Sequence, residues 1–348
     1  MTVLGCQTGM EERMPAFATH EIFGEEALEE TGGKLSEVVH KHKEVFRLGC
    51  QGPDLFFFNP FMKRVHHKVN LGSRLHTSEV NRFFEVYMEE LLALSNKQGL
   101  EIGISYFLGF ISHYTLDTQM HPYIFAKSGY HPEEPDAGRQ AFPAHQRLEA
   151  VIDRKMLMAK KGIMPSGYYP EKRIKLSEAE LCVVARLMSR TLQRIYHIMI
   201  FDENIKASYR CMRGVIRQVY DHTGRKRQQI RKFESGVLGR PVIANMTVAD
   251  QMPDPRDAMN DKGRKWTSPW NPEETYHSSV WEMYDVALER YQEYYGQVES
   301  LLCGLLQRIK FVEQHKSRAG NAKQFLAERI SKVVTGLENR DYHTGKNK

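Results

Sequence analysis

The sequence predicts an all-α protein. Apolar residues recur every three or four positions in one segment after another, whereas no run alternates as a half-buried strand would. Helix-start signals precede several of these segments, and the clearest is the capping box Ser177-Glu-Ala-Glu180. We find no phosphate-binding or dinucleotide-binding glycine pattern and no internal repeat. With 348 residues, 41% of them hydrophobic, the chain can form a substantial core.

The first 13 residues show no hydrophobic periodicity. We expect these residues to be a disordered or non-native leader, with Met14 as an alternative start. Helices are expected from Thr19 to the Gly32-Gly33 pair, from Leu35 to Phe46 and over 78–95. Between the second and third helices, Gly49-Cys-Gln-Gly-Pro-Asp54 is rich in turn residues and places Asp54 on a loop.

The central helix is expected over about 100–121, where Pro122 should end it because proline disfavours helical backbone at the preceding residue. A loop rich in glycine, proline and acidic residues follows over 128–143. The next helix should run over 145–158.

Two further helices are expected in the middle of the chain, from the capping box to about residue 200 and over 202–222. Five prolines then mark a linker or lid, and the last helix starts near Val280 and leads into a basic, frayed tail. We divide the chain into a helical domain, a proline-rich linker or lid, and a C-terminal helical extension with a basic tail, over 14–235, 236–279 and 280–348.

Charge and cysteine usage narrow the partners and the compartment. A net charge of +6 and a pI of about 8.9 favour an anionic partner such as a phosphate, a nucleic acid or an acidic lipid. Residues 206–232 hold nine Lys or Arg against the single acid Asp221, which fits a phosphate-facing or membrane-facing surface or a solvated face. The five cysteines show no CxxC spacing, and no apolar run is long enough to be a membrane span or a signal segment. We expect a cytoplasmic location, with peripheral membrane contact as a further option.

Two helical segments carry metal-ligand side chains at a spacing of four residues. His113, Asp117 and His121 form one stripe, and His145 with Glu149 forms another, because residues four apart share a helix face. The residues leading into the first stripe are strongly apolar, so its polar groups should be buried and should need a metal or a charged partner. Imidazole with carboxylate suits Zn²⁺.

The ordered series of candidate ligands resembles the zinc-dependent phospholipase C family, which is related to the fungal single-strand-specific nucleases and shares their helical fold. The series reads His, Gly-Pro-Asp, Leu-His, His-x3-Asp-x3-His and His-x3-Glu, and its members are His20, Asp54, His76, His113, Asp117, His121, His145 and Glu149. The resemblance covers residues 14–158 by motif and extends to residue 235 by helical pattern, and the C-terminal third has no counterpart in it.

The resemblance implies a ligand set for each zinc ion. Asp54, His76, His113 and Asp117 would hold one ion, and His121, His145 and Glu149 would hold a second. A third would use His20, with Asp117 bridging. In the family the amino-terminal residue completes that third site, often as a tryptophan, and no tryptophan precedes His20 here. Two ions are therefore expected, and the third is left open.

The resemblance also implies hydrolysis of a phosphate ester, most directly cleavage of a phospholipid of the phospholipase C type. Closely spaced divalent ions offset the charge of the phosphate and lower the pKa of a bound water to about 7. Asp54 is the candidate general base or water-orienting group as well as a ligand. Leu55 stands where the bacterial lipase has an aromatic hydroxyl for choline, so choline specificity is not carried over. The alternatives are a nuclease or nucleotidase on the same metals, and a non-catalytic, zinc-stabilised protein that binds a membrane or a partner.

Overall fold

The all-α prediction is confirmed by the computed structural model, which describes residues 16–59, 70–134, 136–223, 225–237, 243–314 and 319–348. The predicted leader, residues 1–13, lies outside this described part. The helices up to the central one are α1 (Phe17–Thr31), α2 (Gly33–Lys41), α3 (Lys43–Gly49), the 3-10 turn η1 (Gly52–Phe56), α5 (Leu71–Thr77), α6 (Val80–Ala93) and α7 (Lys97–Ser128). After them come α8 (Ala137–Met156), η2 (Leu157–Lys161), η3 (Pro165–Gly167), α9 (Pro170–Arg173), α10 (Glu178–Tyr196), α11 (Asp202–Val219), α12 (Lys226–Val237), α13 (Ile243–Met246), α14 (Val280–Gln314) and α15 (Ala319–Gly336).

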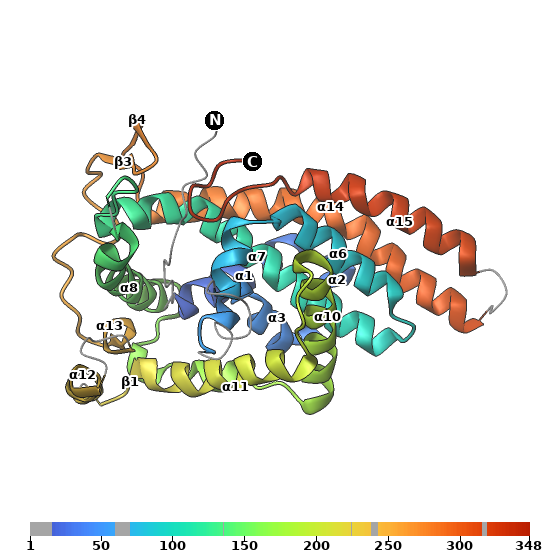
Figure 1. Ribbon diagram of the computed structural model, residues 1–348, viewed down its shortest axis with the longest axis horizontal. Coiled ribbons are helices and arrows are strands. Elements are labelled where there is room, and N and C mark those ends of the chain that lie inside the picture. Colours follow the sequence, from blue (N-terminus) through green and yellow to red (C-terminus); the bar gives the residue numbers. More distant parts are fainter. Residues whose placement is uncertain (1–15, 60–69, 135, 224, 238–242, 315–318) are drawn as a thin grey trace.

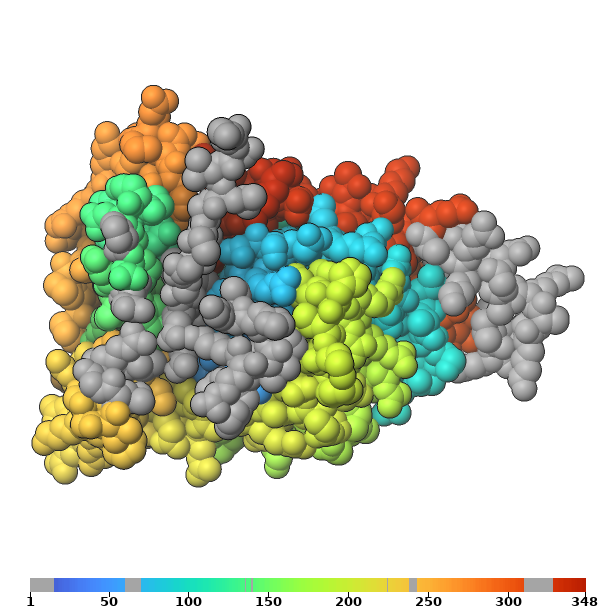
Figure 2. All heavy atoms as spheres, viewed as in Figure 1, coloured from blue at the N-terminus to red at the C-terminus, as the bar shows by residue number. Residues whose placement is uncertain are grey.

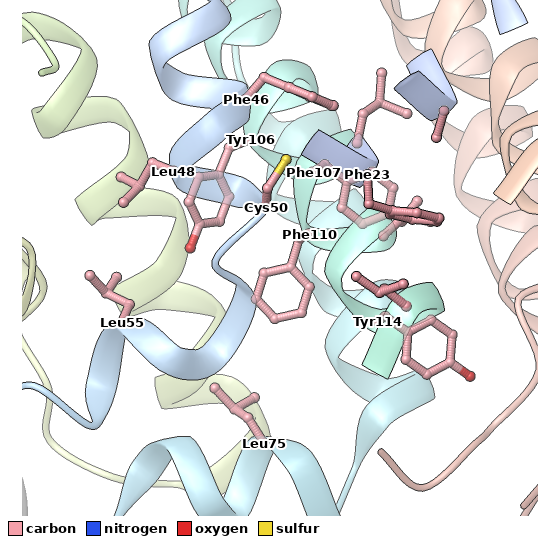
Figure 3. Close-up of a cluster of buried hydrophobic side chains, with 14 of the residues drawn as sticks. Phe23, Phe46, Leu48, Cys50, Leu55, Leu75, Tyr106, Phe107, Phe110 and Tyr114 are labelled. Carbon is pink, nitrogen blue, oxygen red and sulfur yellow. The ribbon is translucent and has the colours of Figure 1, made fainter. Parts of the chain in front are cut away.

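Helix α7 forms the centre of the molecule (Figure 1). Every residue from Gly99 to Thr118 is buried, as expected for a helix that is apolar on most of its surface and enclosed by other helices. Helices α1, α3, α8, α10 and α14 all pack against it. Figure 3 shows the apolar cluster on one side, where side chains from α1, α3, η1 and α5 meet α7. This packing fixes α7 firmly, and with it the stripe of candidate ligands.

Two prolines that we expected to lie outside helices are inside them. Helix α7 continues through Pro122 to Ser128, and α8 already contains Pro143. A proline inside a helix costs about 3 kcal/mol, largely through one lost hydrogen bond and a clash with the preceding turn. Tyr123 and Phe125 are buried just beyond Pro122, and their packing outweighs this cost. The predicted helix over 35–46 is instead two helices, because the backbone leaves the helical region at His42.

Short strands occur in the proline-rich part of the chain and at residues 220–221, the end of the helix predicted over 202–222, where the sequence predicted none. Strand β1 (Tyr220–Asp221) pairs in parallel with β2 (Val248–Ala249), and β3 (Trp266–Ser268) pairs antiparallel with β4 (Asn271–Tyr276). Strands β1, β2 and β3 have only two or three residues, and β4 buries none of its side chains fully, so no alternation of apolar and polar residues was visible. Whether this segment works as a linker or a lid stays a prediction.

The C-terminal helices are packed on the rest of the protein. Helix α14 lies along α7, and α15 returns along α14 and α6 (Figure 1). The tail beyond α15 is not frayed as expected: Leu337, Asp341, Tyr342 and His343 are all buried. An aromatic ring and a histidine inside the basic stretch provide the apolar contacts that a purely charged tail would lack.

Candidate metal centre

Five elements bring the predicted ligands together. Helix α1 supplies His20, η1 supplies Asp54 and α5 supplies His76. Helix α7 supplies His113, Asp117 and His121, and α8 supplies His145 and Glu149. None of these eight predicted ligand residues is more than 5% exposed. Eight residues spread over 130 positions of sequence therefore share one buried site, and no predicted ligand lies elsewhere.

The Asp117 carboxylate lies at the middle of the site. Its Oδ2 is 2.9 Å from Nε2 of His113 and 3.5 Å from Nε2 of His76. Its Oδ1 is 3.1 Å from Nε2 of His20 and 3.6 Å from Nε2 of His121. Each oxygen therefore faces a different set of imidazoles, which is the arrangement a carboxylate needs to bridge two cations.

We call Asp54, His76 and His113 the Asp54 group. Asp54 Oδ1 lies 3.3 Å from Nε2 of His76 and 4.0 Å from Nε2 of His113, and one ligand atom of each residue lies within 4.8 Å of the others. Gly52 makes this approach possible. Its φ is +47°, and a Cβ there would lie 2.3 Å from Cδ2 of the His113 ring. Only glycine lets the turn carrying Asp54 pack this closely on the imidazole.

We call His121, His145 and Glu149 the Glu149 group. The imidazole Nε2 of His145 is 3.2 Å from Oε1 of Glu149 one turn later on α8. One ligand atom of each residue again lies within 4.8 Å of the others. His20 joins His113 and Asp117 in a third set of the same kind, and the His20 and His113 rings stack with centroids 4.2 Å apart.

Backbone carbonyls set the tautomers of three imidazoles. Nδ1 of His76 lies 2.8 Å from the Gly72 carbonyl oxygen, and Nδ1 of His113 lies 3.1 Å from that of Cys50. Nδ1 of His121 lies 3.0 Å from the carbonyl oxygen of a residue far along the chain, Tyr342. A carbonyl only accepts, so each Nδ1 must donate its hydrogen. In the neutral ring, Nε2 then presents a lone pair to the centre of the site, as in metal-ligating histidines.

Polar atoms without hydrogen bonds gather in this site. Among the described residues, buried side-chain atoms with no hydrogen-bond partner include seven from the predicted ligands: His20 Nδ1, Asp54 Oδ1, His76 Nε2, His113 Nε2, Asp117 Oδ2, His121 Nε2 and Glu149 Oε2. An unsatisfied buried polar atom costs about 1–3 kcal/mol, so such a cluster is costly unless something else binds it. The donor set of imidazole nitrogens and carboxylate oxygens fits zinc.

The electrostatics of the metal-free site differ between histidines. Burial opposes protonation of His76, but the nearby carboxylates of Asp117 and Asp54 raise its pKa well above the ordinary value. Burial lowers the pKa of His121 well below its ordinary value, because the charge of Asp117 only partly offsets burial and the imidazole of His145 adds to the shift. The nearby imidazoles, His113 foremost, hold the pKa of Asp117 well below its usual range in spite of its burial. A proton in this site is therefore held beside Asp117 and Asp54 and not at His121.

Two buried residues beside the site were not predicted from sequence. The ring centroid of Tyr342 is 4.8 Å from that of His76, and the ring centroid of His343 is 6.0 Å from that of His121. Nothing in their local sequence marks them, since a tyrosine and a histidine in a basic stretch are ordinary surface residues. Only the return of the chain over α7 reveals them.

The basic segment 206–232 makes many internal contacts. Lys206 forms ion pairs with Glu178 and Glu203, at 3.1 and 3.0 Å. The guanidinium of Arg213 donates to the Glu171 carbonyl, and Lys226 donates to that of Arg217. Part of this charge therefore serves the fold. Within the described part of the chain, no helix is long and apolar enough to cross a membrane.

Comparison with known proteins gives one match. A family model described as zinc dependent phospholipase C matches residues 19–219, more than half of the chain. The matched range contains all eight predicted ligands and leaves out α14, α15 and the tail after them. No match was found among curated proteins or among solved structures.

Proposed function

The chain belongs to the zinc-dependent phospholipase C family, and on this premise we propose that it hydrolyses a phosphate ester, most directly a phospholipid by phospholipase C-type cleavage. The observation that carries the proposal is the cluster of buried, unsatisfied nitrogen and carboxylate oxygen atoms around Asp117. Such a cluster is stabilised by divalent cations, and a purely structural site would need far fewer ligands than the eight present.

We assign the ligands as the three sets of neighbouring side chains indicate. The Asp54 group with Asp117 would hold one zinc ion and the Glu149 group a second. His20 with Asp117 would contribute to a third. Bound zinc would supply positive charge for the anionic phosphate and lower the pKa of a water molecule toward neutrality.

Asp54 is our candidate for the general base. It lies on a 3-10 turn and not within a long helix, and a small cavity beside it is lined in part by Gln51, Phe58 and Met246. Its Oδ1 faces the site without a hydrogen bond, so it can accept a proton from an attacking water or orient that water. Because Asp54 also belongs to a ligand set, its replacement should affect both metal binding and catalysis.

The type of reaction does not determine which phospholipid headgroup the protein accepts. Leu55 follows Asp54 directly and is 1% exposed, packed in the apolar cluster with Leu75 (Figure 3). It therefore offers no contact to a headgroup, which supports leaving choline specificity aside. The same metal set would also serve a nuclease or nucleotidase, and only the substrate test below separates the two.

Peripheral membrane contact through residues 206–232 is the remaining part of the proposal. Each lysine or arginine near an anionic membrane contributes about 1 kcal/mol of attraction, but residues already paired internally contribute less. The candidates that remain are the basic residues whose side chains make no ion pair or hydrogen bond within the described part of the chain: Arg217, Arg225, Arg231 and Lys232. The cytoplasmic location stays a prediction from cysteine usage.

The test is phosphate-ester release from a panel of substrates. Phospholipid vesicles of defined headgroup, nucleotides and single-stranded DNA would be incubated with the zinc-loaded protein and with the Asp54→Asn variant. We expect release of a phosphorylated headgroup from lipid, lost on chelation and in the variant. Release from nucleotides or DNA alone would select the alternative enzyme. No release from any member, by protein with full zinc content, would contradict an enzymatic function.

A further inference from the structure

The segment after α15, residues 337–347, lies outside the range matched by the family and is anchored on α7. The hydroxyl of Tyr114 donates toward the Leu337 carbonyl at 3.2 Å and accepts from the Arg340 amide at 2.9 Å. Tyr114 lies one residue after the ligand His113, so the anchor is placed beside the metal centre. Figure 1 shows the segment, in dark red, continuing from α15 along the upper edge of the molecule toward β3 and β4.

The segment is a compact turn with its own hydrogen bonds. The Asp341 carboxylate accepts from the amides of His343 and Thr344, at 2.9 and 3.0 Å. Arg340 and Asn347 pair as an isolated bridge, so the two arms of the turn are held together. In Figure 2 the C-terminal residues are visible at the surface, next to the β3–β4 hairpin and α15. This geometry gives the turn a defined shape that can hold a group in place.

Tyr342, at the inner end of the turn, contacts two ligands from different groups. Its amide donates to the carbonyl of His76 at 3.2 Å, and its ring packs on the His76 imidazole. Its carbonyl oxygen accepts from Nδ1 of His121 at 3.0 Å. For His76 and His113, the corresponding carbonyls come from Gly72 and Cys50, inside the family range. Among these three imidazoles, His121 alone is oriented from outside that range.

We propose that Tyr342 is a positioning residue for zinc at the Glu149 group, a proposal that rests on the metal centre proposed above. Its backbone carbonyl fixes the ring orientation and the tautomer of His121, so that Nε2 faces His145 and Glu149. Carbonyl or carboxylate partners of ligating histidines contribute about 10-fold to 100-fold to metal affinity. The C-terminal extension of this chain thus orients a ligand of the Glu149 group, whereas at the Asp54 group it contacts His76 but leaves the orientation of that imidazole to the Gly72 carbonyl.

A close contact between Gly345 and helix α7 holds the turn in position. Pro122 has no N–H to offer the Thr118 carbonyl four residues earlier. The backbone of Gly345 packs against this carbonyl: a Cβ on Gly345 would lie 2.3 Å from the Thr118 oxygen and 3.4 Å from the Pro122 ring. Its φ of +65° is also a conformation that disfavours side chains. Both the close contact and the positive φ therefore require glycine at position 345, and any larger residue should displace the turn.

The test uses full-length variants and zinc affinity, which does not depend on the reaction. Metal-free wild type, Gly345→Ala and a matched control, Gly129→Ala, would be titrated with zinc against a competing chelator. Gly129 has a φ of +79° and open space around it, so its variant carries the same backbone cost without a clash. We expect Gly345→Ala to weaken one class of sites about 10-fold to 100-fold and leave the other unchanged, with Gly129→Ala like wild type.

Two further variants separate positioning from folding. Tyr342→Phe keeps the backbone and the ring, so it should retain wild-type affinity. Asp341→Ala loosens the turn without a clash, so it should weaken the same class of sites by a smaller factor and remains informative if Gly345→Ala does not fold. Nitrogen-15 spectra should show the Nδ1-protonated tautomer of His121 in wild type and its loss in Asp341→Ala. Affinity in Gly345→Ala equal to that of Gly129→Ala, or equal weakening of both classes of sites, would overturn the proposal. Normal zinc affinity without hydrolysis would count against the proposed reaction and not against Tyr342.

Discussion

The Asp54 group and the Glu149 group use the same kinds of ligand but are held in different ways. His76 and His113 are oriented by carbonyls of the α5 and α3 regions, within 63 positions of sequence. His121 is oriented by a carbonyl 221 positions away. The Nδ1 partners of the first group therefore lie within the range that the family model matches, whereas that of His121 in the second group lies in the C-terminal extension. A ligand motif thus indicates which residues meet, while the residues that orient them can come from distant parts of the chain.

The largest effect is expected from Asp117→Asn, because this carboxylate faces both groups. The change keeps the size of the side chain but removes the charge, so zinc binding to both groups should fall by more than about 100-fold, and activity with it. Zinc content and hydrolysis would be measured on the same preparation. Loss of zinc at only one group would show that Asp117 does not link them.

Asp153→Asn is the matched control for Asp117→Asn. Asp153 lies one turn beyond Glu149 and is fully buried, but its carboxylate accepts from Thr19, from the Ala18 amide and from the Tyr220 hydroxyl. In Asp153→Asn the side-chain NH₂ group would face hydrogen-bond donors that it cannot accept from. The free energy of unfolding should therefore fall by about 1–3 kcal/mol, with zinc content retained. The two variants should therefore show opposite signatures, and equal zinc loss in both would contradict the assignment.

A selective effect is expected from Gly52→Ala. The added Cβ would clash with the His113 ring and strain a backbone with positive φ, so the Asp54 group should lose zinc while the Glu149 group keeps it. Gly162→Ala, at φ +63° in open space, is the control for the backbone cost alone. Competition titrations of both variants would check the result, which mirrors the one expected for Gly345→Ala. Loss of zinc from both groups in Gly52→Ala would mean that they are not independent.

A smaller effect is expected from pH. The raised pKa of His76 means that the metal-free protein still holds a proton there above pH 6.5, and zinc must displace it. Affinity at the Asp54 group should therefore rise with pH, by about tenfold per unit for one displaced proton, until the raised pKa is passed. His121, with its lowered pKa, is already neutral and should release none. Calorimetry in buffers of different ionisation enthalpy would count the protons.

The same shift has a consequence for the stability of the metal-free protein. Since folding raises the pKa of His76, its contribution is fully present below pH 6.5 and is lost as pH rises through the raised value. Folding lowers the pKa of His121, so stability from that residue falls as pH drops below 6.5. Thermal unfolding across this range would show whether the His76 contribution disappears in a His76→Ala variant, as it should.

The sequence was sufficient for the helical class and for the set of residues that meet. Spacing of four placed His113, Asp117 and His121 on one face of a helix, and the structure brings that face to α8. The sequence was insufficient wherever tertiary packing outweighs local preference. Pro122 continues a helix because buried residues follow it, and Tyr342 reaches the site only through the return of α15 along α14. Assignment of each ligand to a particular ion stays a prediction.

The central claim is a zinc centre with more than one ion, and metal analysis of the purified protein tests it most directly. Elemental analysis and hydrolysis would be measured on protein as isolated, after chelation and after readdition of zinc. We expect two or more zinc ions per chain, with hydrolysis lost on chelation and restored by zinc. A single ion at full occupancy in fully active protein would contradict it.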